Sequence, residues 1–354
     1  MCIRDSGYSS GLVYTALTTA GYALGEAGPE VLRVVQILIG AATAAVVVLL
    51  AGLLGAGRGA AVAAGVLVAL HPALVYYDVR KLHPLGLDTL LPTAFVAAVL
   101  VSRRAGAWAC AACGVLLGAA ILERLTFAPM LAVAAFWIAD ERPWRERRRG
   151  LAAFAGATLL MLAPWVVRNQ RVFGAPILST MAPEFFFIGN VPPSLGSCLL
   201  PSGDKVLDAA PAALRARLRA ADERGQADIF REASWAFVRR EPATFVAGLL
   251  RKLVYFWTWA PQTGVSYPAS YRRVYLTLYV ALLVAAIVGA WRLAHGSVEA
   301  RRGLGLIVAL CVTVSCLQAL LYFELRHRWA LEPLLIVLAI FARPATSETR
   351  PSRG

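Results

Sequence analysis

Residues 34–56 read VVQILIGAATAAVVVLLAGLLGA, a run without a single charged side chain. A helix that crosses the hydrocarbon core of a bilayer needs about 20 consecutive apolar residues, so this stretch predicts a membrane span. Glycine and alanine are interspersed with the larger aliphatic residues, which permits helices to pack closely in lipid. The fold therefore depends on how many further runs of this kind the chain contains.

The whole chain shares the character of this stretch. It has 354 residues, of which 59% are hydrophobic and 16% are charged, whereas soluble domains contain about 45–50% apolar and about 25% charged residues. This composition excludes a disordered chain, a small disulfide-linked scaffold and an ordinary cytosolic enzyme. It predicts an all-α fold, a polytopic transmembrane helical bundle, and thus an integral membrane protein surrounded by lipids.

Nine apolar runs follow one another along the chain. They are residues 34–56, 60–77, 85–101, 107–122, 125–139, 151–167, 271–291, 304–322 and 329–341. We expect a first block of six spans in residues 34–167 and three more in residues 271–342. Between them, residues 168–270 form an external insertion. It contains a charged, amphipathic helical stretch at residues 212–240, whose apolar residues Ile229, Ala233, Ala236 and Phe237 recur at helical spacing.

Residues 245–259 are apolar too, but they carry Arg251 and Lys252 among several aromatic residues. This pattern is typical of a helix that lies in the membrane interface rather than one that crosses it.

The arginine residues give the orientation. The formal net charge is +14, and basic residues collect in cytoplasmic loops. Placing residues 141–150 (ERPWRERRRG) in the cytoplasm also places the 292–302 loop and the 343–354 tail there, with the N-terminal segment, residues 1–33, outside. Topology therefore accounts for the basic balance, and no nucleic-acid partner is needed. We expect a bacterial-type plasma (inner) membrane, with the active face external or periplasmic.

The start of the chain does not read as a natural beginning. Met1–Ser6 (MCIRDS) does not join to the following pattern, and it lacks the basic and apolar regions of a signal peptide. An odd number of spans with an external N-terminus suggests that a first span and a first external loop are missing and that residues 1–6 are an artificial addition.

Ionisable residues remain at the external ends of the spans, where topology does not explain them. Such groups at membrane depth are candidates for function. One group is YYDVRKLHP at residues 76–84, a second surrounds Arg168, and a third is ELRHR at residues 324–328 with Glu332. Arginine can hold a phosphate through its planar fork, and histidine can titrate or bind a metal. The alternative interpretation is an interfacial belt of tyrosines and snorkelling cations.

Several nucleotide and hydrolase motifs are absent from the sequence. It contains no Walker A lysine motif, no G-x-G-x-x-G and no H-E-x-x-H. Cys110 and Cys113 lie inside an apolar run, and no Cys–His cluster has zinc spacing. A lipid-borne substrate is therefore the natural alternative to a nucleotide held in a soluble domain.

Two segments resemble a known family. Residues 164–180 (PWVVRNQRVFGAPILST) and 185–190 (FFFIGN) resemble the membrane glycosyltransferases of the GT-C superfamily, in the group of the dolichyl-phosphate-mannose-protein mannosyltransferases and aminoarabinose transferases (glycosyltransferase families 39 and 83). The shared elements are Pro164-Trp165, Arg168-Asn169, Phe173-Gly174 and Gly189-Asn190. The late segment ELRHRWALEPL, residues 324–334, resembles a further element of that group through Arg326, Arg328 and Pro333.

The resemblance implies a GT-C-like bundle that transfers a sugar from a polyprenyl-phosphate donor to a lipid, glycan or protein acceptor, with inversion at the anomeric carbon. It implies that the substrate site includes Arg80, Lys81, Arg168, Asn169, Asn190, Arg326 and Arg328, and that Asp78 and His83 are the catalytic candidates on the acceptor or metal side. No cofactor is certain, and a divalent metal is compatible with this chemistry. The group carries its catalytic acid in the first external loop, which we expect to be missing from this sequence, and His83 stands roughly where the group often has a second acid.

Two other functions stay open at this point. A transporter or flippase of a lipid-linked or anionic solute predicts pseudo-symmetric halves and helices broken near the bilayer midplane. A non-catalytic, truncated homologue is the second alternative, because the missing loop would carry the catalytic acid.

Overall fold

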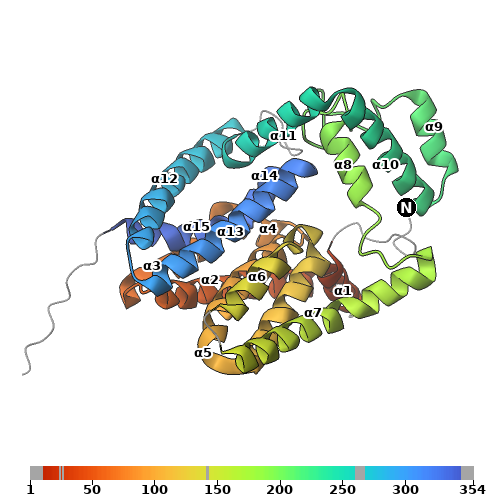
Figure 1. The fold of residues 1–354 in the computed structure, drawn as a ribbon. Coiled ribbons are helices and arrows are strands. Elements are labelled where there is room, and N and C mark those ends of the chain that lie inside the picture. The colour runs from red at the N-terminus through yellow and green to blue at the C-terminus, as the bar shows by residue number, and fades with distance from the viewer. Residues whose placement is uncertain (1–10, 24, 26–27, 141–142, 260–267, 344–354) are drawn as a thin grey trace, which may run out of the picture.

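The computed structural model describes residues 11–23, 25, 28–140, 143–259 and 268–343. The structure is 81% helical, and within the described ranges the β structure is limited to one isolated bridge between Leu199 and Lys205. Figure 1 shows the helices packed as a bundle, with α8, α9 and α10 gathered at one end. The proposed addition at Met1–Ser6 and the tail from residue 344 lie outside the described residues.

Every predicted apolar run lies on a helix. Six helices or half-helices are long and apolar enough to cross a membrane, as expected for a polytopic membrane protein. They are α2 (Gly28–Leu53), the two halves of α5 (Leu85–Glu123) at Leu85–Arg103 and Ala105–Glu123, α7 (Trp144–Phe173), α12 (Ala269–Ala294) and α13 (Val298–Leu320).

The three remaining runs form shorter helices. α3 (Arg58–Ala69) and α4 (Pro72–Arg80) make a pair bent by 47°, which would be a seventh span if the pair crosses as one. Shorter apolar segments are Leu125–Ala139, made of η2 (Leu125–Phe127) and α6 (Met130–Ala139), and Glu332–Ala342, made of α15 (Glu332–Ala339) and η3 (Ile340–Ala342). By length and composition, six or seven segments can therefore span a membrane. That the two short segments also cross it stays a prediction.

A glycine turn folds α5 back on itself. Gly106 has φ 77° and ψ −166° between the two halves, a conformation that glycine adopts without the steric cost of a Cβ. The halves run antiparallel, so Asp88 and Arg124 meet at one end, where the Arg124 Nη2 lies 2.5 Å from the Asp88 Oδ2. At the opposite end, Arg103 and Arg302 lie 3.7 Å and 3.2 Å from the Asp140 carboxylate.

Small residues let α5 and α7 pack closely. A Cβ at Gly114 would lie 2.3 Å from the Phe154 carbonyl oxygen, and one at Gly118 would lie 2.6 Å from the Met161 Cβ. The Thr158 hydroxyl of α7 also donates to the Gly114 carbonyl at 3.2 Å. Glycine and a bonding hydroxyl at a helix contact are the features that hold helices together in lipid.

The described part of the N-terminal segment is largely helical. α1 (Leu12–Tyr22) packs against the bundle, and α2 already begins at Gly28. The Tyr14 hydroxyl donates to the Gln36 Oε1 at 2.8 Å, and the Tyr14 backbone N–H donates to the Glu123 Oε2 at 3.0 Å. The predicted external segment 1–33 therefore contains one whole helix and the start of the next.

The predicted insertion contains more helices than expected and begins later. α7 continues through Arg168 and Asn169 to Phe173, and it ends at Gly174, which has a left-handed φ of 67°. The insertion then holds α8 (Ala182–Asn190), α9 (Ala212–Ala220), α10 (Glu223–Arg240) and α11 (Pro242–Trp257).

The single helix predicted at residues 212–240 is two helices. The Asp222 carboxylate accepts from the Gly225 N–H at 2.8 Å and so begins α10 as an N-cap. The buried face of α10 is also shifted from the predicted one: Ala227, Phe230, Ser234 and Phe237 are buried, whereas Ala236 is exposed. Phe230 packs with Phe187, Ile188 and Val206 in a small apolar core separate from that of the bundle.

Candidate functional site

Six ionisable side chains from three parts of the sequence gather at the end of the bundle where α5 starts and finishes. We call them the rim cluster. They are His83, Asp88, Arg124, Glu324, Arg326 and His327. His83 precedes α5, Asp88 lies in its first turn and Arg124 follows its last residue, while the other three lie at the start of α14 (Leu325–Trp329).

Two ion pairs organise the rim cluster. Arg124 pairs with Asp88, and the Arg326 Nε lies 2.5 Å from the Glu324 Oε2. The second Glu324 oxygen accepts from the Cys198 thiol at 3.1 Å. Because the Phe323 N–H donates to the Gly196 carbonyl at 2.8 Å, the chain entering α14 is anchored to the loop that follows α8.

The acids of the rim cluster are more deeply buried than its arginines. The Asp88 and Glu324 side chains are 1% and 5% exposed, whereas those of Arg124 and Arg326 are 22% and 27% exposed. Each arginine therefore contacts a buried carboxylate, and part of its side chain is exposed. Arginine can hold an anion such as a phosphate through its planar fork.

The two histidines lie in an electropositive environment. Burial, then the charges of Arg326 and Arg124, lowers the pKa of His83 to about 3. Burial, then the charges of Arg124, Arg326 and His83, lowers the pKa of His327 well below its usual value. Both imidazoles are therefore neutral at pH 7. The His327 Nδ1 and the Asp88 Oδ1 are buried and have no hydrogen-bond partner among the described residues.

No described ion pair or hydrogen bond joins the Asp78 carboxyl to the rim cluster. Its carboxyl oxygens are 2.5 Å and 3.2 Å from where a Cβ would stand on Gly40 of α2 and on Gly86 of α5. Its side chain lines a separate cavity between these helices and the α3–α4 pair. No described contact joins the Asp78 carboxyl to the imidazole of His83, the other predicted catalytic residue, although Gln36 bonds the backbone of both residues at 3.2 Å and 3.3 Å.

Arg80 and Lys81 are exposed at the end of α4. The Lys81 carbonyl accepts from the Gln36 Nε2 at 2.7 Å, but this contact belongs to the backbone. Both cations are accessible to an anion, and neither forms an ion pair with a described acidic side chain.

Arg168 and Asn169 lie near the C-terminal end of α7, where the helix contacts the chain that follows it. The Arg168 guanidinium lies 4.8 Å and 5.6 Å from the ring centroids of Trp165 and Phe173. The fully buried Asn169 donates to the Ile177 carbonyl at 2.8 Å, and the Trp165 indole donates to the Leu178 carbonyl at 3.0 Å. These residues thus form a local helix-to-loop closure, and no described contact joins Arg168 to the rim cluster.

Asn190 is also held by the protein itself. Its Nδ2 donates to the Phe186 and Leu320 carbonyls, both at 2.8 Å, and its Oδ1 accepts from the Lys252 Nζ at 2.7 Å. Lys252 is only 1% exposed and also donates to the carbonyls of Gly189 and Leu321. Burial, with a smaller effect of Arg251, lowers the pKa of Lys252 to about 7.

Arg328 is caged inside the bundle. Its Nη1 donates to the Phe256 and Thr258 carbonyls at 2.9 Å and 2.6 Å, its Nη2 to the Tyr275 hydroxyl at 3.0 Å, and its Nε to Glu332 at 3.3 Å. The guanidinium lies 3.7 Å from the Tyr279 ring centroid, and the side chain is 0% exposed. All three nitrogens are occupied, so this geometry gives Arg328 a structural role rather than the predicted phosphate contact.

The rim cluster contains residues that the sequence argument did not select. Asp88 lies within an apolar run, and this isolated acid was itself the available signal. Arg124 follows Glu123 directly, so a local reading pairs these neighbours, whereas the structure pairs Arg124 with Asp88, 36 residues earlier. Among the described residues, no group of three His, Cys, Asp or Glu side chains is placed to hold a metal ion.

Comparison of the chain with known protein families, with curated proteins and with solved structures finds no match.

Proposed function

We propose that the protein is a membrane glycosyltransferase that uses a polyprenyl-phosphate-linked sugar as donor, and that the rim cluster binds the phosphate of that donor. The observation that carries the proposal is the pair Arg124 and Arg326. Both side chains are partly exposed and lie beside two neutral histidines, at one end of an apolar bundle. The likeness of residues 164–190 and 324–334 to the GT-C group supports the same chemistry.

The ion pairs of the rim cluster suit the leaving group of this reaction. As the glycosidic bond breaks, negative charge grows on the lipid phosphate, and donors that are already positioned stabilise that charge without reorganising. Asp88 and Glu324 hold the two arginines in place before substrate arrives. Arg80 and Lys81, exposed at the end of the neighbouring helix, add positive charge for capture of the anion.

His83 keeps its proposed place on the acceptor side. Its low pKa makes it a weak base in the free protein. A phosphate anion bound by Arg124 and Arg326 would offset their charge and favour protonation of the imidazole. His83 could then take a proton from the acceptor hydroxyl as the new bond forms. Asp78 is not part of this arrangement because its carboxyl lines another cavity.

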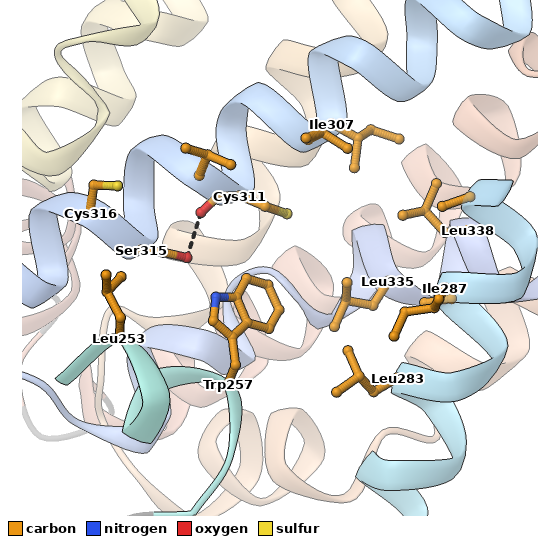
Figure 2. Close-up of a pocket in the computed structure, with 14 residues that line it drawn as sticks. Leu253, Trp257, Leu283, Ile287, Ile307, Cys311, Ser315, Cys316, Leu335 and Leu338 are labelled. Carbon is orange, nitrogen blue, oxygen red and sulfur yellow. Dashed lines mark hydrogen bonds between the residues drawn. The ribbon is translucent and has the colours of Figure 1, made fainter. Parts of the chain in front are cut away.

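An apolar cavity offers a place for part of the lipid chain. It has a volume of about 400 Å³ and lies between α11, α12, α13 and α15, as Figure 2 shows. Its lining includes Trp257, Leu283, Ile307 and Leu335, and the Ser315 hydroxyl in it is already bonded to the Cys311 carbonyl at 2.6 Å. Glu324, Arg326 and His327 of the rim cluster follow the C-terminal end of α13, the helix that lines this cavity.

The proposal is tested by a transfer assay with synthetic polyprenyl-phosphate sugars and the purified protein in detergent or vesicles. Replacing Arg124 or Arg326 by alanine should reduce turnover by about 10²-fold or more, as for loss of a donor to a developing oxyanion. Arg301→Ala, an exposed arginine at the other end of α13, is the matched control. Equal turnover of Arg326→Ala and the unmodified protein would show that the rim cluster takes no part in the reaction.

A transporter of a lipid-linked or anionic solute is the second candidate. The observation that favours it is the 47° bend between α3 and α4, where Pro72 follows the buried His71, because transporters often bind their substrates at broken helices. Uptake of a labelled polyprenyl phosphate into vesicles, without transfer of the sugar, would favour this function over the first.

A further inference from the structure

A cavity of about 240 Å³ lies between α2, the α3–α4 pair and α5. Residues from all these elements line it, including Ile37, Thr43, Val68, Val75, Asp78 and Thr89. It is smaller than the roughly 300–1,000 Å³ typical of drug-sized binding sites. It therefore fits a small molecule or the end of a longer one.

The polar end of this cavity is the Asp78 carboxyl. Asp78 is 8% exposed and is the one ionisable residue among those lining the cavity. No ion pair or side-chain hydrogen bond joins its carboxyl to another described residue. A buried carboxyl without a partner is costly, and such a group at membrane depth calls for a functional explanation.

Two glycines make room for this carboxyl. A Cβ on Gly40 would lie 2.5 Å from the Asp78 Oδ2, and a Cβ on Gly86 would lie 3.2 Å from the Oδ1. Larger residues at these positions would displace the carboxyl from its place between α2 and α5. The arrangement therefore depends on the absence of side chains at Gly40 and Gly86.

The other polar atoms of the lining can only accept hydrogen bonds. The Thr43 hydroxyl donates to the Ile39 carbonyl at 3.0 Å, and the Thr89 hydroxyl donates to the Leu85 carbonyl at 2.6 Å. Each hydroxyl already donates its one proton in a hydrogen bond, so its oxygen can only accept a further bond through its lone pairs. A ligand that complements Asp78, Thr43 and Thr89 must therefore supply donors and positive charge.

The rest of the lining is apolar and reaches the protein surface. Ile37, Val75 and Val79 are 47%, 41% and 43% exposed and flank the cavity. A ligand entering between them would present an apolar body to these side chains and a donor to the acid. An alcohol brings one donor and no charge, whereas a primary ammonium brings three donors and one positive charge.

We propose that this cavity binds the protonated primary-amine end of an apolar amine, with the ammonium against Asp78 and the apolar body toward the membrane. The lining of this site contains no residue of the rim cluster, and the proposal does not depend on the proposed transfer reaction.

The test uses the full chain in detergent micelles and three probes of similar shape: 2-phenylethylamine, 2-phenylethanol and 3-phenylpropionate. Binding is measured by saturation-transfer NMR with competition among the probes. We expect saturable binding of the amine, with the alcohol and the carboxylate at least about tenfold weaker, the range expected when a charged partner is lost. Equal binding of the amine and the alcohol would overturn the proposal.

Two matched pairs of variants locate the site. Asp78→Asn keeps the shape of the side chain and should weaken amine binding by about tenfold or more, while Asp228→Asn, at an exposed position, should not change it. Gly40→Ala should displace the Asp78 carboxyl and also weaken binding. Gly52→Ala on the same helix is its control, because a Cβ there meets nothing within 4 Å.

Thermal unfolding of each variant shows whether it is folded. If folded Asp78→Asn binds the amine as well as the unmodified chain does, the amine occupies another site or the micelle, and the assignment is wrong. If Asp78→Asn does not fold, the comparison of Gly40→Ala with Gly52→Ala decides. Equal amine binding by those two variants overturns the proposal.

Discussion

The Nε2 of His71 lies 2.6 Å from the Oε2 of Glu332, although 261 residues separate them in the sequence. Glu332 also accepts from the Tyr275 hydroxyl and from the Arg328 Nε. Through these bonds one carboxylate connects the bend between α3 and α4 to α12, α14 and α15. The connection is fully internal, since His71 and Glu332 are 8% and 0% exposed.

Glu332→Gln should destabilise the protein strongly. The substitution removes the negative charge opposite the buried Arg328, and breaking a buried pair in this way costs about 3–5 kcal/mol. The midpoint of thermal or denaturant unfolding in detergent measures the effect. Glu232→Gln is the matched control because Glu232 pairs with Arg217 at the surface, where the loss should stay within about 1 kcal/mol. Equal midpoints for the two variants would contradict a structural role for this network.

Lys252→Met should loosen the junction of α8, α11 and the end of α13. The substitution leaves the Gly189 and Leu321 carbonyls and the Asn190 amide oxygen without their shared donor. Each buried acceptor left without a donor costs about 1–3 kcal/mol. Unfolding midpoints again measure the effect. The neighbouring, exposed Arg251→Met should change stability by less than about 0.5 kcal/mol, so a similar loss in both variants would show that charge alone is responsible.

Asn169→Ala should destabilise the helix-to-loop closure without acting on the rim cluster. The buried amide holds the Ile177 carbonyl, and losing this bond should cost about 1–3 kcal/mol. Limited proteolysis of the 174–181 link would detect local opening, with Gln170→Ala on an exposed face of α7 as the control. A variant of normal stability that loses transfer activity would instead place Asn169 in the substrate site, as the sequence predicts.

Stability should fall as the pH is lowered from about 6.5 towards 3. The folded pKa of His83 is lowered to about 3, so between the two values the unfolded chain binds more protons than the folded one. Each such histidine contributes a slope of up to about 1.4 kcal/mol per pH unit. Unfolding midpoints measured across this range for the unmodified chain and for His83→Gln test the sign. The variant should show the smaller slope, and the exposed His295→Gln should not differ from the unmodified chain.

Arg326→Gln should raise the pKa of His83. Of the two arginines whose positive charges disfavour protonation of this imidazole, Arg326 has the larger effect on the pKa. The chain has 4 histidines, so NMR with labelled histidine can follow each imidazole through a pH titration. Arg301→Gln is the control, because Arg301 is exposed and lies at the N-terminal end of α13, 25 residues before Arg326. An unchanged His83 titration in Arg326→Gln would show that these two side chains do not interact.

Local pattern was sufficient to predict the long apolar helices, because a helix that crosses a bilayer needs about 20 consecutive apolar residues. It did not predict α1 or α8, which lie outside the apolar runs. It was not sufficient at helix ends. The bend at His71 and Pro72 lies inside one apolar run, and the capping bond of Asp222 divides a stretch with continuous helical spacing. In both places a few local contacts with the backbone determine where the helix bends or begins. Hydrophobic periodicity carries no information about such contacts.

The candidate site was only partly predictable. Residues 83, 326 and 327 were selected because ionisable groups are rare at span ends, and the structure does bring them together. Arg80, Arg168 and Arg328 satisfied the same criterion, yet one is exposed, one stacks on its own helix and one is caged. A sequence shows that a charge is unusual, but the partner that explains it depends on which helices pack together.

The turn at Gly106 has a consequence for how the chain tolerates change. The two arms of α5 start from that residue and must return Asp88 and Arg124 to within ion-pair distance at the other side of the bundle. Since each residue of a helix adds about 100° of rotation and 1.5 Å of rise, a single insertion between Leu91 and Gly106 would swing Asp88 away from Arg124. Insertions and deletions in these arms should therefore be far less tolerated than substitutions, even where the inserted residue only faces lipid.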